Sequence, residues 1–217
     1  MIDSEKPYLV IDASSPLLHS GVIKNEKWLS LKTFQGDTLE SLTQLVDKCL
    51  KESSLDMESI KGFIFCEGPG SLLGLRLSAM AINTWKVLSD QQCSCPLRCY
   101  KSLPALGLQL QKNQNGFDHV VSPFRKGFYN HYDIRQETLS LIGADVAKSL
   151  DGEVAFLPQR RLKEKLNESW QEVPYSIKDL PVILAKRGLL HKADYADAWV
   201  PEETEYVRWS QERHRKG

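Results

Sequence analysis

Hydrophobic residues in the first part of the chain form runs that are typical of buried strands. A continuous apolar run from Tyr8 to Ile11 predicts a strand covered on both faces. Two further segments, Leu18 to Ile23 and Trp28 to Phe34, flank the polar turn KNEK and predict a pair of strands. We expect the three strands to follow one another as a meander.

The pattern then changes to alternating helices and strands. Asp37 and Glu40 fit a capping box, and apolar residues at helical spacing predict an amphipathic helix from Asp37 to about Glu52. The apolar positions of this helix are Leu39, Leu42, Val46, Cys49 and Leu50. After it we expect a buried strand GFIFCEG, a long apolar helix up to Leu88, a strand near Arg98 to Tyr100, and a helix from about Leu103 to Gln111.

This order of elements, β-β-β-α-β-α-β-α, is the ribonuclease-H-like pattern, and helical crossovers after a meander imply parallel pairing. The polar, turn-rich segment QKNQNG predicts a lobe boundary, which gives an N-terminal lobe of residues 1–112 and a smaller lobe of residues 113–217. In the second lobe, HVVSPF and FYNHYDI flank RKG as a hairpin. A strand EVAFLP, a helix from about Ile177 to Leu190 and a basic tail, RWSQERHRKG, complete the chain.

Composition places the chain among ordinary globular proteins. Of its 217 residues, 41% are hydrophobic and 26% are charged, and 28 basic residues balance 28 acidic ones. No overall field therefore favours a nucleic acid or a membrane surface. The start of the chain does not read as a secretory signal, and no apolar run approaches the ~20 residues that span a bilayer. The five cysteines suit reduced thiols, so we expect a cytoplasmic protein.

Gly68, Gly70 and Gly74 follow the predicted strand GFIFCEG but fit neither phosphate-binding fingerprint. Their spacing is one residue too long for G-x-G-x-x-G, and Leu75 and Arg76 stand where a P-loop needs lysine and then serine or threonine. A structural explanation fits better. Pro69 and Gly70 make a tight turn, Ser71 caps the helix, and Gly74 allows close packing.

The end of the first strand and this glycine turn should nevertheless lie together. In open α/β sheets ligands bind beyond the carboxyl ends of parallel strands. A vestigial nucleotide pocket would then use Asp12 for a hydrated Mg²⁺, Ser14 for a phosphate oxygen, and Gly68, Gly70 and Ser71 at the helix N-terminus. The alternative is that Asp12 and the serines after it form a plain Asx turn.

The helix after the glycines is more apolar than one contact requires. Arg76, Asn83 and Lys86 fall in one narrow sector of the helix, and apolar residues occupy much of the remaining circumference. A helix packed on one side needs an apolar stripe only a little over ~100° wide. We expect its own sheet to cover one side, and a partner protein or a second copy to cover the other. A helix enclosed within a larger monomer is the alternative.

Other patterns argue against a metal centre and a nucleic-acid site. The five histidines include no pair at i, i+4 spacing, and CSCPLRC, which ends at Cys99, lacks a C-x-x-C pair. We therefore expect no bound metal. The basic tail could contact RNA, but a solvated terminus is the better default.

Four segments share their order and spacing with a known family. They are LVIDASS near the start, EGPGSLLGLRL in the middle, VVSPFRKGFYNHY in the second lobe and EYVR near the end. They resemble the TsaB (YeaZ) family of tRNA threonylcarbamoyladenosine (t6A) biosynthesis proteins over nearly the whole chain. The most specific part is the glycine-proline-glycine-serine motif with Gly74 and Arg76.

This resemblance implies a two-lobed, actin-like ATPase fold that has lost its catalytic machinery. Members of the family act as scaffolds for the catalytic subunit TsaD, which works with the ATPase TsaE, so that the scaffold meets tRNA only indirectly. The same surface can form a homodimer. We expect no cofactor, with ATP or ADP at the partner interface as the alternative. The residues expected at the interface are Leu39, Leu42, Val46, Leu72, Leu73, Leu75, Arg76, Ala79, Met80, Ile82 and Asn83.

Two other functions stay open, and departures from the family pattern favour one of them, a divergent homodimer. Leu72-Leu73 replaces the common Phe-Thr, Ala13 replaces a threonine, and Pro123 replaces an aspartate before Arg125. One alternative is an active phosphotransferase or ATPase of the same superfold. The other is a divergent homodimeric adaptor with an unrelated role.

Overall fold

The chain folds around two β-sheets. The computed structural model describes residues 3–36, 38–90, 95–113, 115–159, 165–184 and 188–201, with backbone alone at Thr38, Leu39 and Asp90. The predicted cap at Asp37, the motif EYVR and the basic tail lie outside the described residues. None of the described helices combines the length and apolarity needed to cross a bilayer.

The first sheet has six strands in the order β11-β5-β4-β1-β2-β3. Its strands are β1 (Tyr8–Asp12), β2 (Leu17–Lys24), β3 (Lys27–Gln35), β4 (Gly62–Gly68), β5 (Leu97–Lys101) and β11 (His191–Ala193). β1, β2 and β3 pair antiparallel, whereas β1, β4 and β5 pair parallel. The predicted meander and parallel crossovers are confirmed, and the order β3-β2-β1-β4-β5 is that of ribonuclease H.

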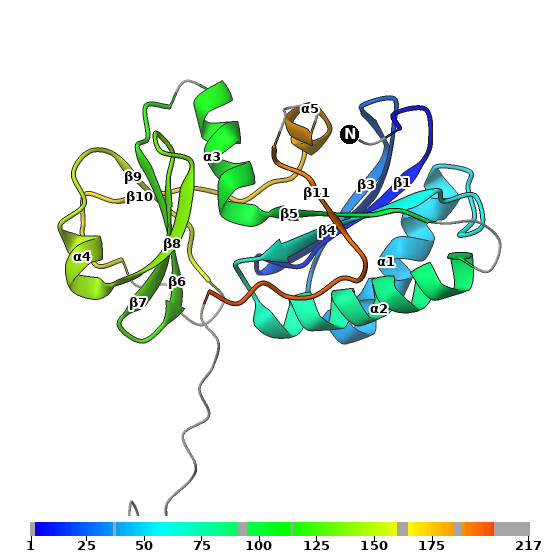
Figure 1. The fold of residues 1–217 in the computed structure, drawn as a ribbon, viewed down its shortest axis with the longest axis horizontal. Coiled ribbons are helices and arrows are strands. Elements are labelled where there is room, and N and C mark those ends of the chain that lie inside the picture. Colours follow the sequence, from blue (N-terminus) through cyan, green and yellow to red (C-terminus); the bar gives the residue numbers. More distant parts are fainter. Residues whose placement is uncertain are drawn as a thin grey trace, which may run out of the picture.

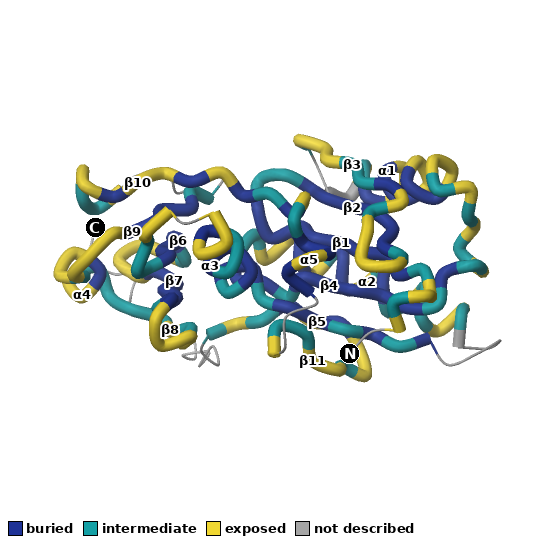
Figure 2. The backbone as a smooth tube through the Cα atoms, turned by 90° about the horizontal axis from the view of Figure 1, so that it is seen from above, coloured by how far each residue is buried: buried dark blue, intermediate teal, exposed yellow. Residues whose placement is uncertain are grey.

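Helices cover both faces of this sheet (Figure 1). On one face lie α1 (Thr38–Glu52) and α2 (Leu72–Asp90), and on the other lie α3 (Ser102–Lys112) and the short α5 (Leu180–Leu184). Apolar side chains of α1 and α2 pack with Leu9, Phe63 and Phe65 in one core. The central strands are buried along most of their length, and exposed segments lie toward the rim (Figure 2).

The second sheet has five strands in the order β10-β9-β6-β7-β8. Its elements are β6 (His119–Arg125), β7 (Phe128–Asp133), β8 (Thr138–Gly143), α4 (Ala144–Lys148), β9 (Val154–Phe156) and β10 (Gln171–Glu172). The predicted hairpin and the strand within EVAFLP are confirmed, while β8, α4, β10 and β11 were not predicted. The helix expected from Ile177 to Leu190 is wrong in extent, because Gly188 has a φ of 95° and β11 begins at His191.

The chain changes from the first sheet to the second after α3 and later returns. β11 pairs antiparallel with β5, so residues beyond the second sheet complete the edge of the first. One continuous core joins Ile64 and Tyr100 of the first sheet to Val120 and Tyr132 of the second through Leu106 of α3. The predicted division at residue 113 stays a prediction, but the two sheets share this core.

Candidate functional site

The loops after β1 and β4 lie against each other, as the order of the strands predicts. The Ser71 N–H donates a hydrogen bond of 3.0 Å to the Ser14 carbonyl oxygen, and the Ser71 carbonyl accepts from the Leu75 N–H at 2.9 Å. Ser71 therefore stands at the start of α2. One of the N-terminal amides that could face an anion is already bonded within the protein.

The glycines of this turn make the close approach feasible. A Cβ atom at Gly70 would overlap the Ser14 carbonyl oxygen, and one at Gly74 would come within 2.9 Å of the Ala13 carbonyl oxygen. Gly68 has a φ of 111°, a conformation that side chains rarely adopt. The prediction that Gly74 permits close packing is confirmed, and the space between the two loops is filled by backbone.

Asp12 lies at the centre of this arrangement and is fully buried. One carboxylate oxygen accepts hydrogen bonds from the Ser14 N–H at 2.8 Å and the Ser14 hydroxyl at 2.7 Å. The other accepts from the hydroxyls of Tyr100 at 2.6 Å and Tyr175 at 2.5 Å. The Asx-turn interpretation of Asp12 and Ser14 is confirmed, and two tyrosines that the sequence did not indicate close the other side.

The surroundings of Asp12 keep neighbouring groups neutral. Burial, and then the charge of Asp12, raise the pKa values of the Tyr100 and Tyr175 hydroxyls and the Cys66 thiol well above their ordinary values. Burial lowers the pKa of His19, although Asp12 opposes this shift. The tyrosines therefore remain protonated donors to Asp12, and the thiol is not poised as a nucleophile.

Several residues expected at a partner interface lie in the core instead. The buried ones are Leu42, Val46, Leu75, Ala79 and Ile82, which pack between the first sheet and its two helices. Asn83 also faces its own chain, because its side-chain amide both donates to and accepts from the Ala196 backbone, at 2.9 and 2.7 Å. The Leu39 side chain lies outside the described residues. The buried leucines and isoleucine stabilise the fold and present no surface to a partner.

The opposite side of α2 carries exposed apolar residues. Leu73, Met80 and Val87, spaced seven apart, are 69%, 67% and 64% exposed, and Leu72 and Leu88 are 42% and 59% exposed beside them. Arg76 lies exposed among them. We call Leu72, Leu73, Met80, Val87 and Leu88 the outer face of α2. The helix thus has two apolar sides, as expected, and the protein's own core covers one of them.

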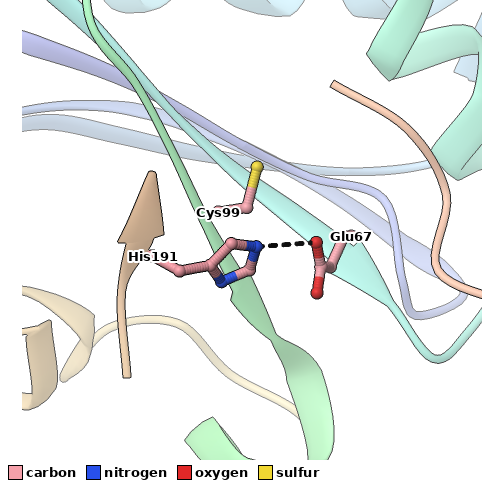
Figure 3. A group of neighbouring side chains, drawn as sticks. All are labelled: Glu67, Cys99 and His191. Carbon is pink, nitrogen blue, oxygen red and sulfur yellow. Dashed lines mark ion pairs between the residues drawn. The ribbon is translucent and has the colours of Figure 1, made fainter. Parts of the chain in front are cut away.

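A second cluster of polar groups lies near the edge of the first sheet. Glu67, Cys99 and His191 come from β4, β5 and β11 and bring a carboxylate, a thiol and an imidazole together (Figure 3). His191 Nε2 lies 3.2 Å from a Glu67 carboxylate oxygen. Sequence patterns missed this cluster because its members are far apart in the chain and none forms a short motif.

An open cavity lies between α3, the strands β7 and β8, and the segment that leads into β11. It has a volume of about 610 Å³. Its lining includes Lys101, Tyr132, Glu137 and His191. None of the residues predicted to hold a nucleotide lines it.

Comparison with known proteins gives matches in structure alone. No model of a protein family matches the chain, and no curated protein sequence matches it. A crystal structure of an uncharacterized protein with similarity to peptidase YeaZ, from Pseudomonas aeruginosa, has a TM-score of 0.63 at 15% identity. It covers 91% of this chain and 100% of its own.

YeaZ from Pseudomonas aeruginosa has a TM-score of 0.53 at 16% identity and covers 70% of this chain and 75% of its own. At such identities the likeness establishes the fold. Together with the strand order of the first sheet, it confirms the predicted fold class. The chain has the YeaZ fold, a two-lobed, mixed α/β fold of the actin-like ATPase type with a ribonuclease-H-like sheet.

Proposed function

We propose that the protein is a TsaB (YeaZ)-type scaffold subunit of the t6A machinery that pairs with TsaD and catalyses no reaction itself. The outer face of α2 is the docking surface in this proposal. The YeaZ fold and the sequence motifs support the family, and the exposed apolar residues of α2 support docking through that helix.

The exposure of apolar side chains on the outer face of α2 is the main support for this proposal. Three apolar side chains repeat every seven residues and are each more than 60% exposed, as in helices that pair with another helix. Contiguous exposed apolar surface is uncommon on a protein that has no partner. Among the described side chains of α1, those exposed to solvent are polar, including Gln44, Asp47 and Lys48, so α1 shows no comparable apolar surface there.

The setting of Asp12 supports the non-catalytic part of the proposal. A nucleotide-binding aspartate of this fold would need a carboxylate oxygen free for a hydrated Mg²⁺. Both Asp12 oxygens instead accept hydrogen bonds from Ser14, Tyr100 and Tyr175. ATP turnover by the isolated protein, lost in Asp12→Asn, would favour the alternative of an active phosphotransferase.

Co-expression with TsaD from the same organism, followed by size-exclusion chromatography, tests the proposal. We expect the native chain to co-elute with TsaD, and Leu73→Asp and Met80→Asp to weaken binding at least about 100-fold, because each places a charge in an apolar contact. Ile82 is fully buried, so Ile82→Asp would unfold the protein and cannot report on docking.

Val146→Asp is the matched control. Val146 is apolar, helical and 55% exposed, but it lies on α4 beside the second sheet. This variant should bind TsaD as the native chain does, and circular dichroism should show all three variants folded. Undiminished co-elution of Leu73→Asp and Met80→Asp would contradict the proposed surface. The homodimeric adaptor would be supported instead if the native chain formed homodimers and did not bind TsaD, and if the same substitutions broke those homodimers.

A further inference from the structure

We propose that Glu67, Cys99 and His191 form a binding site for a divalent transition metal ion of the zinc class. Three neighbouring strands of the first sheet supply one ligand each. The protein would fill three coordination positions of the ion and leave the fourth to water or to another small ligand. This site is separate from the outer face of α2 and does not depend on the proposed scaffold role.

The topology of the sheet brings the three ligands together. β11 pairs with β5 in a register that sets His191 directly opposite Cys99. β5 pairs with β4, and the register shifts between Cys66 and Gly68, which places Glu67 at the irregularity. The strands fix the three backbone positions, so the ligands are held by rigid elements and not by loops.

The distance between His191 and Glu67 suits a tetrahedral ion, and the Cys99 thiol lies near both groups. The three ligand atoms lie within 4.8 Å of one another, and the nitrogen and oxygen of His191 and Glu67 lie 3.2 Å apart. With zinc bonds of about 2.0 to 2.3 Å, ligand atoms in a tetrahedral site are roughly 3.3 to 3.7 Å apart. Figure 3 shows the His191 ring directed toward the Glu67 carboxylate, with the Cys99 sulfur beside them. Small side-chain adjustments would complete the site.

The donor set selects the class of metal. Sulfur, imidazole nitrogen and carboxylate oxygen suit zinc, whereas magnesium and calcium prefer oxygen ligands throughout. Cys99 is buried, but the His191 side chain is 51% exposed, which gives an ion a path from solvent. Burial, and then Glu67, raise the pKa of the Cys99 thiol to about 12. Metal binding would therefore displace the thiol proton.

The alternative is a simple ion pair between His191 and Glu67, with Lys101 Nζ 3.9 Å from the other carboxylate oxygen. An ion pair explains the imidazole and the carboxylate but gives no role to the thiol. A metal site requires all three groups. Cys99 therefore distinguishes the two explanations.

The experiment measures zinc binding by the full-length, tag-free chain after treatment with a chelator. Titration in competition with a chromophoric chelator should give one zinc ion per chain, and Cys99→Ser and His191→Ala should each weaken binding by at least about tenfold. Cobalt added in place of zinc should produce the near-ultraviolet absorption of a cobalt–thiolate bond, which Cys99→Ser should abolish.

Cys49→Ser is the matched control, because Cys49 is also buried and free but lies on α1, away from the cluster. It should keep both the stoichiometry and the cobalt absorption of the native chain. If Cys99→Ser does not fold, His191→Ala decides, since this side chain is half exposed. Failure of the native chain to bind zinc, or binding that Cys99→Ser and His191→Ala leave unchanged, would overturn the site and leave an ion pair only.

Discussion

At the residue scale, the carboxylate of Asp12 connects parts of the chain that are far apart in sequence. It ends β1, and its hydrogen bonds reach Tyr100 on β5 and Tyr175 after the second sheet. Burying a carboxylate costs several kcal/mol, and the short hydrogen bonds that it accepts from Ser14, Tyr100 and Tyr175 offset this cost in part. A residue type that suits Mg²⁺ chemistry therefore serves here to hold the sheet and the returning chain together.

Tyr175→Phe tests this role through the pH dependence of stability. Tyr175 stays protonated in the folded protein well above pH 10.0, its ordinary pKa, whereas the unfolded chain releases the proton there. The native free energy of unfolding should therefore fall as the pH rises above about 10. Above that pH, each such tyrosine lowers the free energy of unfolding by about 1.4 kcal/mol per pH unit. Tyr175→Phe should remove one such contribution.

At neutral pH the same variant should be destabilised by about 1.5 to 3 kcal/mol, because Asp12 loses a hydrogen bond while remaining buried. Urea unfolding at pH 7 to 11 measures both effects. Tyr195→Phe is the control, since Tyr195 is 66% exposed, and it should keep the native stability and slope. If Tyr175→Phe kept the native dependence of unfolding free energy on pH, Tyr175 would not be the protonated donor to Asp12.

Gly70→Ala tests the packing of the two loops. Its Cβ atom would overlap the Ser14 backbone, which cannot move without disturbing the hydrogen bond between Ser14 and Ser71. We expect a loss of about 1 to 3 kcal/mol in urea unfolding. Gly143→Ala, where no atom lies within 4 Å of the added methyl group, should stay within about 0.5 kcal/mol of the native protein. Equal effects of the two substitutions would argue against a filled loop contact.

At the scale of elements, α2 contacts its own sheet, the returning chain and, in our proposal, a partner. Its buried side packs on β4 through Leu75 and Ile82, and Asn83 holds the segment that follows β11. The Trp199 N–H fixes the same segment to the Glu67 carbonyl at 2.7 Å. The returning segment is thus attached at both α2 and β4.

Asn83→Ala should release this segment locally. Both hydrogen bonds to Ala196 are lost, so we expect faster amide exchange in residues 195–199 and a loss of about 1 to 2 kcal/mol in stability. Hydrogen exchange with mass spectrometry measures the change. Thr84→Ala, an exposed neighbour that bonds within its own helix, should leave exchange in 195–199 unchanged. Equal protection in both variants would show that Asn83 does not hold the segment.

At the scale of the whole molecule, the two sheets depend on one core. α3 lies between them, and a Cβ atom at Gly107 would come within 2.6 Å of the Tyr132 ring, so the helix packs closely on the second sheet. Leu106 of α3 belongs to the core that contains residues of both sheets. We therefore expect the described lobes to unfold together.

Leu106→Ala should destabilise both sheets by the same amount, about 2 to 5 kcal/mol, because it leaves a cavity in their shared core. Hydrogen exchange under mild denaturant, followed in peptides of β1 and β6, measures the opening free energy of each sheet. Val121→Ala provides a comparison, since Val121 lies on the far face of the second sheet. A larger loss in β6 than in β1 for Leu106→Ala would mean that the lobes unfold independently.

Much of the fold could be predicted from local patterns. The period of apolar residues determined β1 to β5, α1 to α3 and the hairpin of the second lobe, since burial of one face or both dictates that period. The short elements β8, α4, β10 and β11 escaped prediction because two to six residues carry too little periodicity. The last predicted helix was too long, because Gly188 has a φ of 95°, a backbone conformation that composition alone does not indicate.

Some features of the candidate sites could likewise be predicted from local patterns, and others could not. The sequence predicted that the loops after β1 and β4 meet and that α2 has two apolar sides, because the order of elements along the chain and the helical period follow from local patterns. Three facts needed the packed chain: which side of α2 is exposed, that Tyr100 and Tyr175 enclose Asp12, and that His191 joins Glu67 and Cys99. These facts depend on contacts between residues up to 163 positions apart, which the packing of the whole chain creates.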